Sequence, residues 1–160
     1  MRGAILPDAL LAAAVGMALS FTPVRTARNS AGLMVGVAVA IALVPLPGLS
    51  ADIVFGGCWL SVAVIAASVH LKGGPNAAVA AVLAADAGLW QGLASHVSQG
   101  FSALAFALPA VLLVIPGQLV VRRGWGIAVK VAASWLIAIA GLEFALNLVP
   151  TPGYKPDHMD

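Results

Sequence analysis

Charged side chains are scarce in this chain of 160 residues, where Asp, Glu, Lys and Arg together make up 9% of the positions. A soluble domain carries about 25%. Hydrophobic residues account for 61% of the chain. A surface with so little charge excludes an ordinary soluble domain, so we expect residues 1–160 to form a single integral membrane domain in contact with the lipid bilayer.

Cysteine and the common catalytic motifs are also nearly absent. The single cysteine, Cys58, excludes an intramolecular disulfide and any site built from several cysteines. The sequence contains no phosphate-binding loop, no dinucleotide fingerprint, no H-E-x-x-H pair and no G-x-S-x-G elbow. The basic residues are scattered, which argues against nucleic-acid binding. We therefore expect a protein that is not an enzyme, and the sequence points to no cofactor.

Six apolar segments make up nearly the whole chain. Their hydrophobic runs are continuous and do not alternate, which predicts helices and excludes a barrel. The expected fold class is an all-α membrane protein, a compact bundle of about six transmembrane helices with short loops. The predicted helices are about 4–22, 31–46, 51–71, 75–97, 101–121 and 124–149, with a polar loop at 23–30 and a polar tail at 150–160.

The first segment resembles a secretory signal peptide, because an Arg precedes an apolar stretch that ends in small residues. Pro7 and Asp8 interrupt that stretch, and no clean A-x-A cleavage site follows it. We therefore expect this segment to be retained as the first helix.

Segment 101–121 contains Pro109 and Pro116. Proline removes a backbone donor and kinks or breaks a helix. Two structures are open for this segment: a kinked helix repaired by its neighbours, or a pair of half-helices.

Small residues recur at every fourth position in three segments. The longest such line is Ala80, Ala84, Gly88 and Gly92. Residues at this spacing lie on one helix face, and small side chains there permit close approach of a second helix. The line predicts a tightly packed partner helix. Similar lines at Ala12, Gly16 and Ser20 and at Gly32 and Gly36 suggest further contacts, within this chain or with other membrane subunits.

Lys and Arg are distributed unevenly over the predicted loops. The first, third and fifth loops carry five basic residues and no acid: Arg25, Arg28, Lys72, Arg122 and Arg123. In a protein of the cell inner membrane, the positive-inside rule places these loops in the cytoplasm. Both termini are then expected outside the cytoplasm.

Asp86 is the leading candidate for a functional residue. It lies roughly 16 Å along a helix that starts at Pro75, which is about half the thickness of the hydrocarbon core. A carboxylate at that depth costs on the order of 3 kcal/mol, so such acids usually face protein or water and bind a cation, a proton or a solute. The alternative is a structural acid that is protonated or hydrogen bonded.

Three other polar residues are candidates for a substrate- or ion-binding site. Lys130 could pair with Asp86, or its long side chain could reach the interface with water. Glu143 could line an outer vestibule, and it points away from Lys130 on the same helix. His96 is expected near the outer boundary and His70 near the inner one, so a bis-histidine haem site is disfavoured.

Two functions from different classes remain open. The first is a multi-pass membrane protein that binds or transports a small solute or cation, as the membrane component of a multi-subunit transporter or by itself. The second is a non-catalytic structural subunit or assembly factor of a larger membrane complex. The small size and the small-residue helix faces favour the second, and Asp86 favours the first.

Overall fold

The computed structural model describes residues 5–46, 48–97, 104–105 and 108–148, and these ranges contain helices and no strand. The expected polar tail and part of the fifth segment lie outside the described residues. The elements, in chain order, are α1 (Ile5–Leu19), α2 (Val24–Leu43), α3 (Ala51–Ser68), α4 (Ala77–Val97), the 3-10 helix η1 (Leu108–Leu113), α6 (Val114–Arg122) and α7 (Gly126–Leu148).

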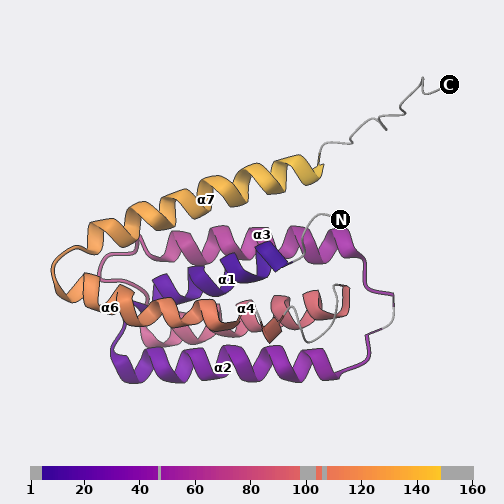
Figure 1. The fold of residues 1–160 in the computed structure, drawn as a ribbon, viewed down its shortest axis with the longest axis horizontal. Helices are drawn as coiled ribbons and strands as arrows, with labels where there is room; N and C mark the ends of the chain where they lie inside the picture. Colours follow the sequence, from indigo (N-terminus) through magenta and orange to yellow (C-terminus); the bar gives the residue numbers. More distant parts are fainter. Residues whose placement is uncertain (1–4, 47, 98–103, 106–107, 149–160) are drawn as a thin grey trace.

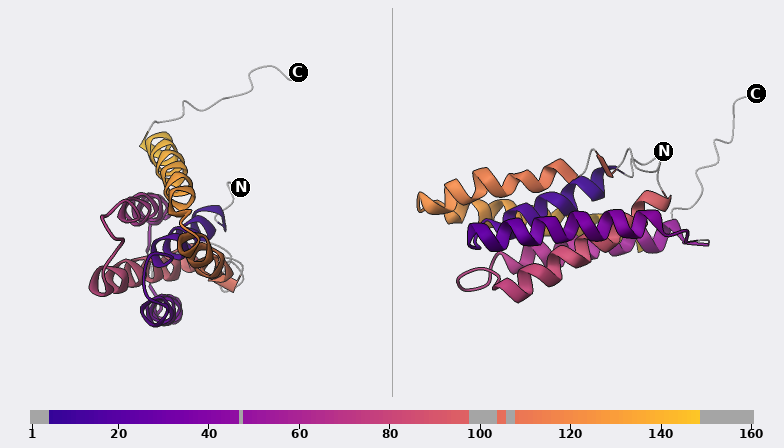
Figure 2. Two further views of the ribbon diagram at one scale, coloured as in Figure 1. Left: turned by 90° about the vertical axis from the view of Figure 1, so that its left-hand side faces the viewer. Right: turned by 90° about the horizontal axis from the view of Figure 1, so that it is seen from below.

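The helices run up and down, roughly parallel to one another (Figure 1). α1, α3 and α6 run in one direction, and α2, α4 and α7 run in the other. Seen along its length, the molecule has α1 near its centre, with α3, α4, α6 and α7 around it and α2 on the far side of α4 (Figure 2). This arrangement places residues of the first helix in the interior.

Four helices are long and apolar enough to cross a membrane: α2, α3, α4 and the Gly126–Leu146 part of α7. The expectation of six spanning helices is not supported. α1 has 15 residues, which gives it a length of about 22 Å, less than the ~30 Å of a hydrocarbon core. The η1–α6 segment is also a shorter apolar helix. The outer surfaces of the long helices remain apolar, with exposed side chains such as Leu43, Ile53, Val82 and Trp135.

Two side chains form hydrogen bonds to backbone carbonyls at the end of α1. The Ser20 hydroxyl donates to the Gly16 carbonyl at 2.8 Å, and the Thr22 hydroxyl donates to the Leu19 carbonyl at 2.8 Å. The Leu19 carbonyl also accepts a hydrogen bond from the Thr22 backbone N–H. Pro23 follows and fixes the start of the next helix.

The polar loop expected at 23–30 is wrong, because α2 begins at Val24 directly after Pro23. Arg25 and Arg28 lie on the exposed side of its first turns, whereas Ala27 and Ser30 are buried. The polar residues of this stretch form the outer face of an amphipathic turn. Polarity in this stretch marks a helix surface and not a connection.

The two prolines of the fifth segment lie at different points of its structure. Pro109 lies in the 3-10 helix η1, and Pro116 lies in the first turn of α6. Proline is tolerated in a first turn because the missing N–H has no intrahelical partner there. Leu108–Arg122 is one continuous apolar helix that changes from 3-10 to α geometry at Val114, so these residues contain no break between two half-helices.

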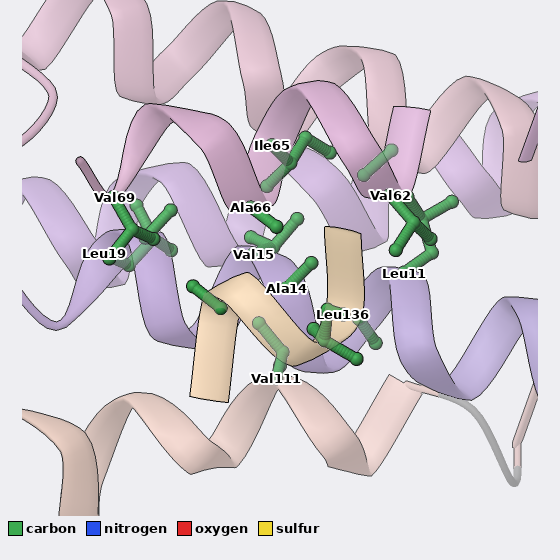
Figure 3. Close-up of a cluster of buried hydrophobic side chains, with 14 of the residues drawn as sticks. Leu11, Ala14, Val15, Leu19, Val62, Ile65, Ala66, Val69, Val111 and Leu136 are labelled. Atoms are coloured by element: carbon green, nitrogen blue, oxygen red, sulfur yellow. The ribbon is translucent and has the colours of Figure 1, made fainter. Parts of the chain in front are cut away.

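The core lies mainly between α1 and α3. Small and branched side chains of the two helices meet across the interface, and residues from η1 and α7 close the cluster (Figure 3). The side chains labelled there are Leu11, Ala14, Val15 and Leu19 of α1, Val62, Ile65, Ala66 and Val69 of α3, and Val111 and Leu136.

The small-residue line of α4 packs tightly against α2, as the sequence predicts. A Cβ atom added at Gly88 would overlap the Met34 carbonyl oxygen of α2. One added at Gly92 would lie 2.8 Å from the Ala38 carbonyl oxygen. Only glycine allows the two backbones to approach this closely, so the partner helix of this line belongs to the same chain.

One end of the molecule gathers the basic residues. The end of α6, the start of α2 and the α3–α4 connection all lie there (Figure 1). Its exposed basic side chains are Arg25, Arg28, Lys72, Arg122 and Arg123. The exposed Asp52 at the start of α3 lies at the opposite end.

Candidate functional site

The central position of α1 buries an acid. Asp8 lies in the first turn of α1 and is 1% exposed. Its Oδ1 atom has no hydrogen-bond partner. A carboxyl oxygen without a partner in a protein interior is costly, because folding removes its water without replacing it.

Gln91 of α4 contacts Asp8 from the neighbouring helix. The amide nitrogen of Gln91, which is 0% exposed, donates a hydrogen bond of 3.0 Å to the backbone carbonyl oxygen of Asp8. This bond fixes the amide group, and it leaves the Gln91 Oε1 atom buried and without a partner. Asp8 and Gln91, which contact each other across two helices, therefore each have one buried acceptor oxygen without a hydrogen-bond partner.

Cys58 of α3 and Asp86 of α4 extend this group. The Cys58 thiol is buried and donates a hydrogen bond of 3.9 Å to the Trp90 carbonyl oxygen of α4. Trp90 precedes Gln91 and follows Asp86 by one helical turn. We call Asp8, Cys58, Asp86 and Gln91 the polar cluster; it lies where α1, α3 and α4 pack together.

Two tryptophans flank the polar cluster in the sequence: Trp59 follows Cys58, and Trp90 precedes Gln91. Trp59 is buried and meets Phe55 edge to face, with ring centroids 6.0 Å apart. The indole N–H of Trp59 is a buried donor without a partner. The Trp90 ring covers Gly57, where an added Cβ would overlap it. A side chain at position 57 would displace this ring.

Asp86 lies at the middle of α4, with nine helical residues before it and eleven after it. Its side chain is half-buried. In the described part of the chain Asp86 forms no ion pair with Lys130. α4 packs on α2, α3 and α1, whereas α7, which carries Lys130, packs mainly on α3. α1 and α3 both contact α4 and α7, and α4 and α7 are not among the helix pairs that pack extensively.

The other three predicted residues lie apart from the polar cluster. The His96 ring is 2.9 Å from the Ile41 carbonyl oxygen near the end of α2, so it joins two helix ends. Lys130 and Glu143 are half-buried on α7, and the Lys130 carbonyl accepts a hydrogen bond from Ser134. His70 is exposed and follows the end of α3, and its Nε2 atom lies 3.3 Å from the Ser134 hydroxyl oxygen. The end of α3 and the end of α4, which carries His96, lie at opposite ends of the bundle (Figure 1).

Sequence reasoning missed Asp8 and Gln91. Asp8 was interpreted as an interruption near the chain start, because nothing in the sequence marks α1 as the central helix. Gln91 did carry a signal: it is an uncharged polar residue inside the apolar run of α4, between the small residues Gly88 and Gly92. A buried amide on the tightly packed side of a helix needs a partner.

Comparison of the chain with known protein families, with curated proteins and with solved structures gives no match. The chemistry of the site therefore has to be argued from its own atoms. In the described residues, no group of three or more His, Cys, Asp and Glu side chains could hold a metal ion. What the polar cluster offers is acceptor oxygen, from a carboxyl and from an amide.

Proposed function

We propose that this chain is an integral membrane protein that binds or moves a small solute or cation through its interior, between α1, α3 and α4. The observation that carries the proposal is the pair of buried acceptor oxygens on Asp8 and Gln91 that have no hydrogen-bond partner. Asp86, half-buried at the middle of α4, supplies a second carboxyl on the helix that carries Gln91.

The cost of this arrangement supports a functional use. A buried polar group without a partner costs about 1–3 kcal/mol, and more when it is charged. In a chain that is 9% charged, a buried acid in the first turn of α1 and a second acid at the middle of α4 are not explained by the needs of packing. Ionisable residues in membrane helices are expensive and usually mark an ion or solute path. The acceptor oxygens fit a ligand that carries positive charge or donates hydrogen bonds.

The membrane setting completes the proposal. The protein lies in a cell inner membrane, with the basic end of the bundle in the cytoplasm and with the start of α1 and the end of α7 on the outer side. The short α1 is surrounded by other helices, whereas η1–α6 lies at the periphery and exposes apolar side chains such as Ile115 and Leu119. The protein acts by binding or transport and not by catalysis, and any energy coupling comes from the solute gradient or from a partner chain.

A second candidate function is a structural subunit of a larger membrane complex. One observation favours it: a Cβ added at Gly32 or Gly36 would meet nothing within 4 Å, so this small-residue face of α2 is unpacked. Such a face suits a helix of another subunit or of a second copy. Disulfide crosslinking from Gly36→Cys in native membranes tests it, with Cys58 replaced by Ser.

Purification from native membrane tests the two candidates against each other. The expected result for the first is a chain that carries a small molecule or ion identified by mass spectrometry, and whose melting temperature rises with inorganic cations or small amines. Asp86→Asn should remove that response while expression stays normal, because an amide is cheaper to bury than a carboxylate. Co-purification of stoichiometric membrane subunits without any ligand response would instead support the structural candidate.

A further inference from the structure

We infer that the basic end of the bundle, formed by Arg25, Arg28, Lys72, Arg122 and Arg123, binds the headgroups of anionic phospholipids. The inference goes beyond the proposed function and does not depend on any solute, since it concerns residues outside the polar cluster. It is carried by the exposed charges, by the contacts that hold three connections together, and by exposed apolar side chains beside the charges.

The basic end carries positive charge and no negative charge. Two of its residues lie in the first turns of α2, one in the α3–α4 connection and two at the end of α6. All five side chains are exposed: Arg25, Arg28, Lys72, Arg122 and Arg123. No Asp or Glu occurs in the three stretches concerned, residues 20–30, 68–76 and 118–126. The positive charges are therefore not neutralised by neighbouring acids of these stretches.

Phe21 and Gln118 hold the three connections against one another. A Cβ atom added at Gly74, in the α3–α4 connection, would lie 2.5 Å from the Phe21 Cβ atom. One added at Gly126, where α7 begins, would lie 3.4 Å from the Phe21 ring. Gln118 of α6 donates a hydrogen bond of 3.1 Å to the Thr22 carbonyl oxygen in the α1–α2 turn. The three connections are thus joined at one end of the molecule, which faces the reader in the left view of Figure 2.

Exposed apolar side chains beside the charges favour a lipid as the occupant. Val24, Leu71 and Trp125 each lie within two residues of a basic side chain, and they are 54%, 48% and 71% exposed. Tryptophan gathers at the level of the headgroups, because its ring is apolar and its N–H is polar. A soluble anion would use the charges alone and leave these apolar side chains in water. A phospholipid contacts both, with its phosphate and with its acyl chains.

The donors of the basic end fit the phosphate of an anionic headgroup. Arginine presents paired N–H groups that match phosphate oxygens. A zwitterionic headgroup carries a positive charge of its own next to its phosphate, which the five basic side chains repel. Clusters of Lys and Arg directly beyond the ends of membrane helices are typical of anionic-lipid binding. Phosphatidylglycerol, which has a net negative charge, therefore suits this end better than phosphatidylcholine.

The test is a lipid titration of the full purified chain in a non-ionic detergent. Unfolding is followed through reaction of the buried Cys58, the single cysteine of the chain, with a fluorescent maleimide. Short-chain phosphatidylglycerol, short-chain phosphatidylcholine and inorganic phosphate are added in separate experiments. Because a ligand that binds only the folded state stabilises it by mass action, we expect a saturable rise in melting temperature with phosphatidylglycerol alone. The rise should disappear in concentrated salt, which screens exposed charges.

Matched variants locate the lipid. The double variant Arg122→Gln, Arg123→Gln should weaken the apparent affinity for phosphatidylglycerol about tenfold or more, because two phosphate donors are lost. The double variant Arg122→Lys, Arg123→Lys keeps the charge and should retain most of the affinity. Lys130→Gln removes a basic residue of α7 outside the three connections and should leave the affinity unchanged. Since Arg122 and Arg123 are exposed, all variants should melt near the wild-type temperature without lipid, which separates lipid binding from folding.

Four outcomes would overturn the inference. An equal rise with phosphatidylcholine would show that the acyl chains act without the charges. An equal rise with inorganic phosphate would make the basic end a site for soluble anions. A phosphatidylglycerol response that survives the double Gln variant would place the lipid elsewhere. No lipid response in the wild type, together with an acidic membrane subunit that co-purifies with it and not with the double Gln variant, would assign this end to a partner protein. None of these results concerns solute binding at Asp86, so the inference can fail while the proposed function stands.

Discussion

The side-chain amide nitrogen of Gln91 donates a hydrogen bond to the backbone carbonyl oxygen of Asp8, joining residues that are 83 positions apart in the chain. The bond connects the first turn of α1 to the last third of α4. The bond uses the amide nitrogen of Gln91 and leaves the amide oxygen, Oε1, without a hydrogen-bond partner. Because both side chains are buried, this contact joins α1 and α4 in the interior of the protein.

The absence of an ion pair between Asp86 and Lys130 leads to the first prediction. Breaking a buried pair would leave an uncompensated charge and cost about 3–5 kcal/mol, and a second change that removes the other charge would restore stability. The helices that carry these residues, α4 and α7, do not pack extensively on each other. We therefore expect Asp86→Asn to have little effect on thermal stability and Lys130→Met to be additive with it.

Melting curves of the two single variants and the double variant in detergent measure this prediction. Wild-type chain that has been carried through the same purification is the reference. Strong destabilisation by Asp86→Asn that Lys130→Met reverses would show that the two residues are structural partners, and it would remove Asp86 from the proposed path.

The contact between α2 and α4 predicts opposite effects for two glycine substitutions. Gly88→Ala places a methyl group against the Met34 carbonyl oxygen, so the helices must separate, and overpacking of this kind costs about 1–3 kcal/mol. Gly36→Ala meets open space. Alanine stabilises a helix interior by roughly 1 kcal/mol relative to glycine. Gly88→Ala should lower the melting temperature, and Gly36→Ala should hold or raise it.

The same pair of variants also probes the outer face of α2. A lower melting temperature for Gly36→Ala in the native membrane, together with no change in dilute detergent, would mean that another helix packs on this face outside the monomer. Equal losses for both variants in detergent would show that the spacing of small residues has no special role in the α2–α4 contact.

The gathering of basic residues at one end predicts the orientation of the protein. A reporter fused after Asp160 should be active only outside the cytoplasm, and one inserted at Gly73 only inside it. Gly73 is suitable because it is exposed, with a φ of 85°, in the connection between α3 and α4. An insertion in the stretch 24–30 would disrupt α2. Cytoplasmic activity of the Asp160 fusion would reverse the proposed orientation.

The sequence was sufficient for features that depend on local pattern. The spacing of Ala80, Ala84, Gly88 and Gly92 predicted a tight helix contact, and the contact exists. Continuous apolar runs predicted helices, and the bounds of α3, α4 and α7 differ from the expected ones by a few residues. These features are fixed within one helix, so they can be recognised without knowledge of its neighbours.

The sequence was insufficient where the arrangement of helices decides the outcome. Asp8 becomes a buried residue only because α1 is surrounded by other helices. α1 ends at Leu19 and α2 begins at Val24, directly after Pro23, although the apolar run of the sequence continues to Thr22. The start of α2 was missed because the polar residues of its first turns, which lie on one helix face, have the same composition as a polar loop.

The central position of α1 imposes an order on how the protein is made. Ribosomes synthesise α1 before α3 and α4, yet these later helices are the ones that cover Asp8 and pack against the α1 core. Until α4 emerges, the Asp8 carbonyl has no contact with Gln91. The contact between α1 and α4 therefore forms only after more than half of the chain has been translated.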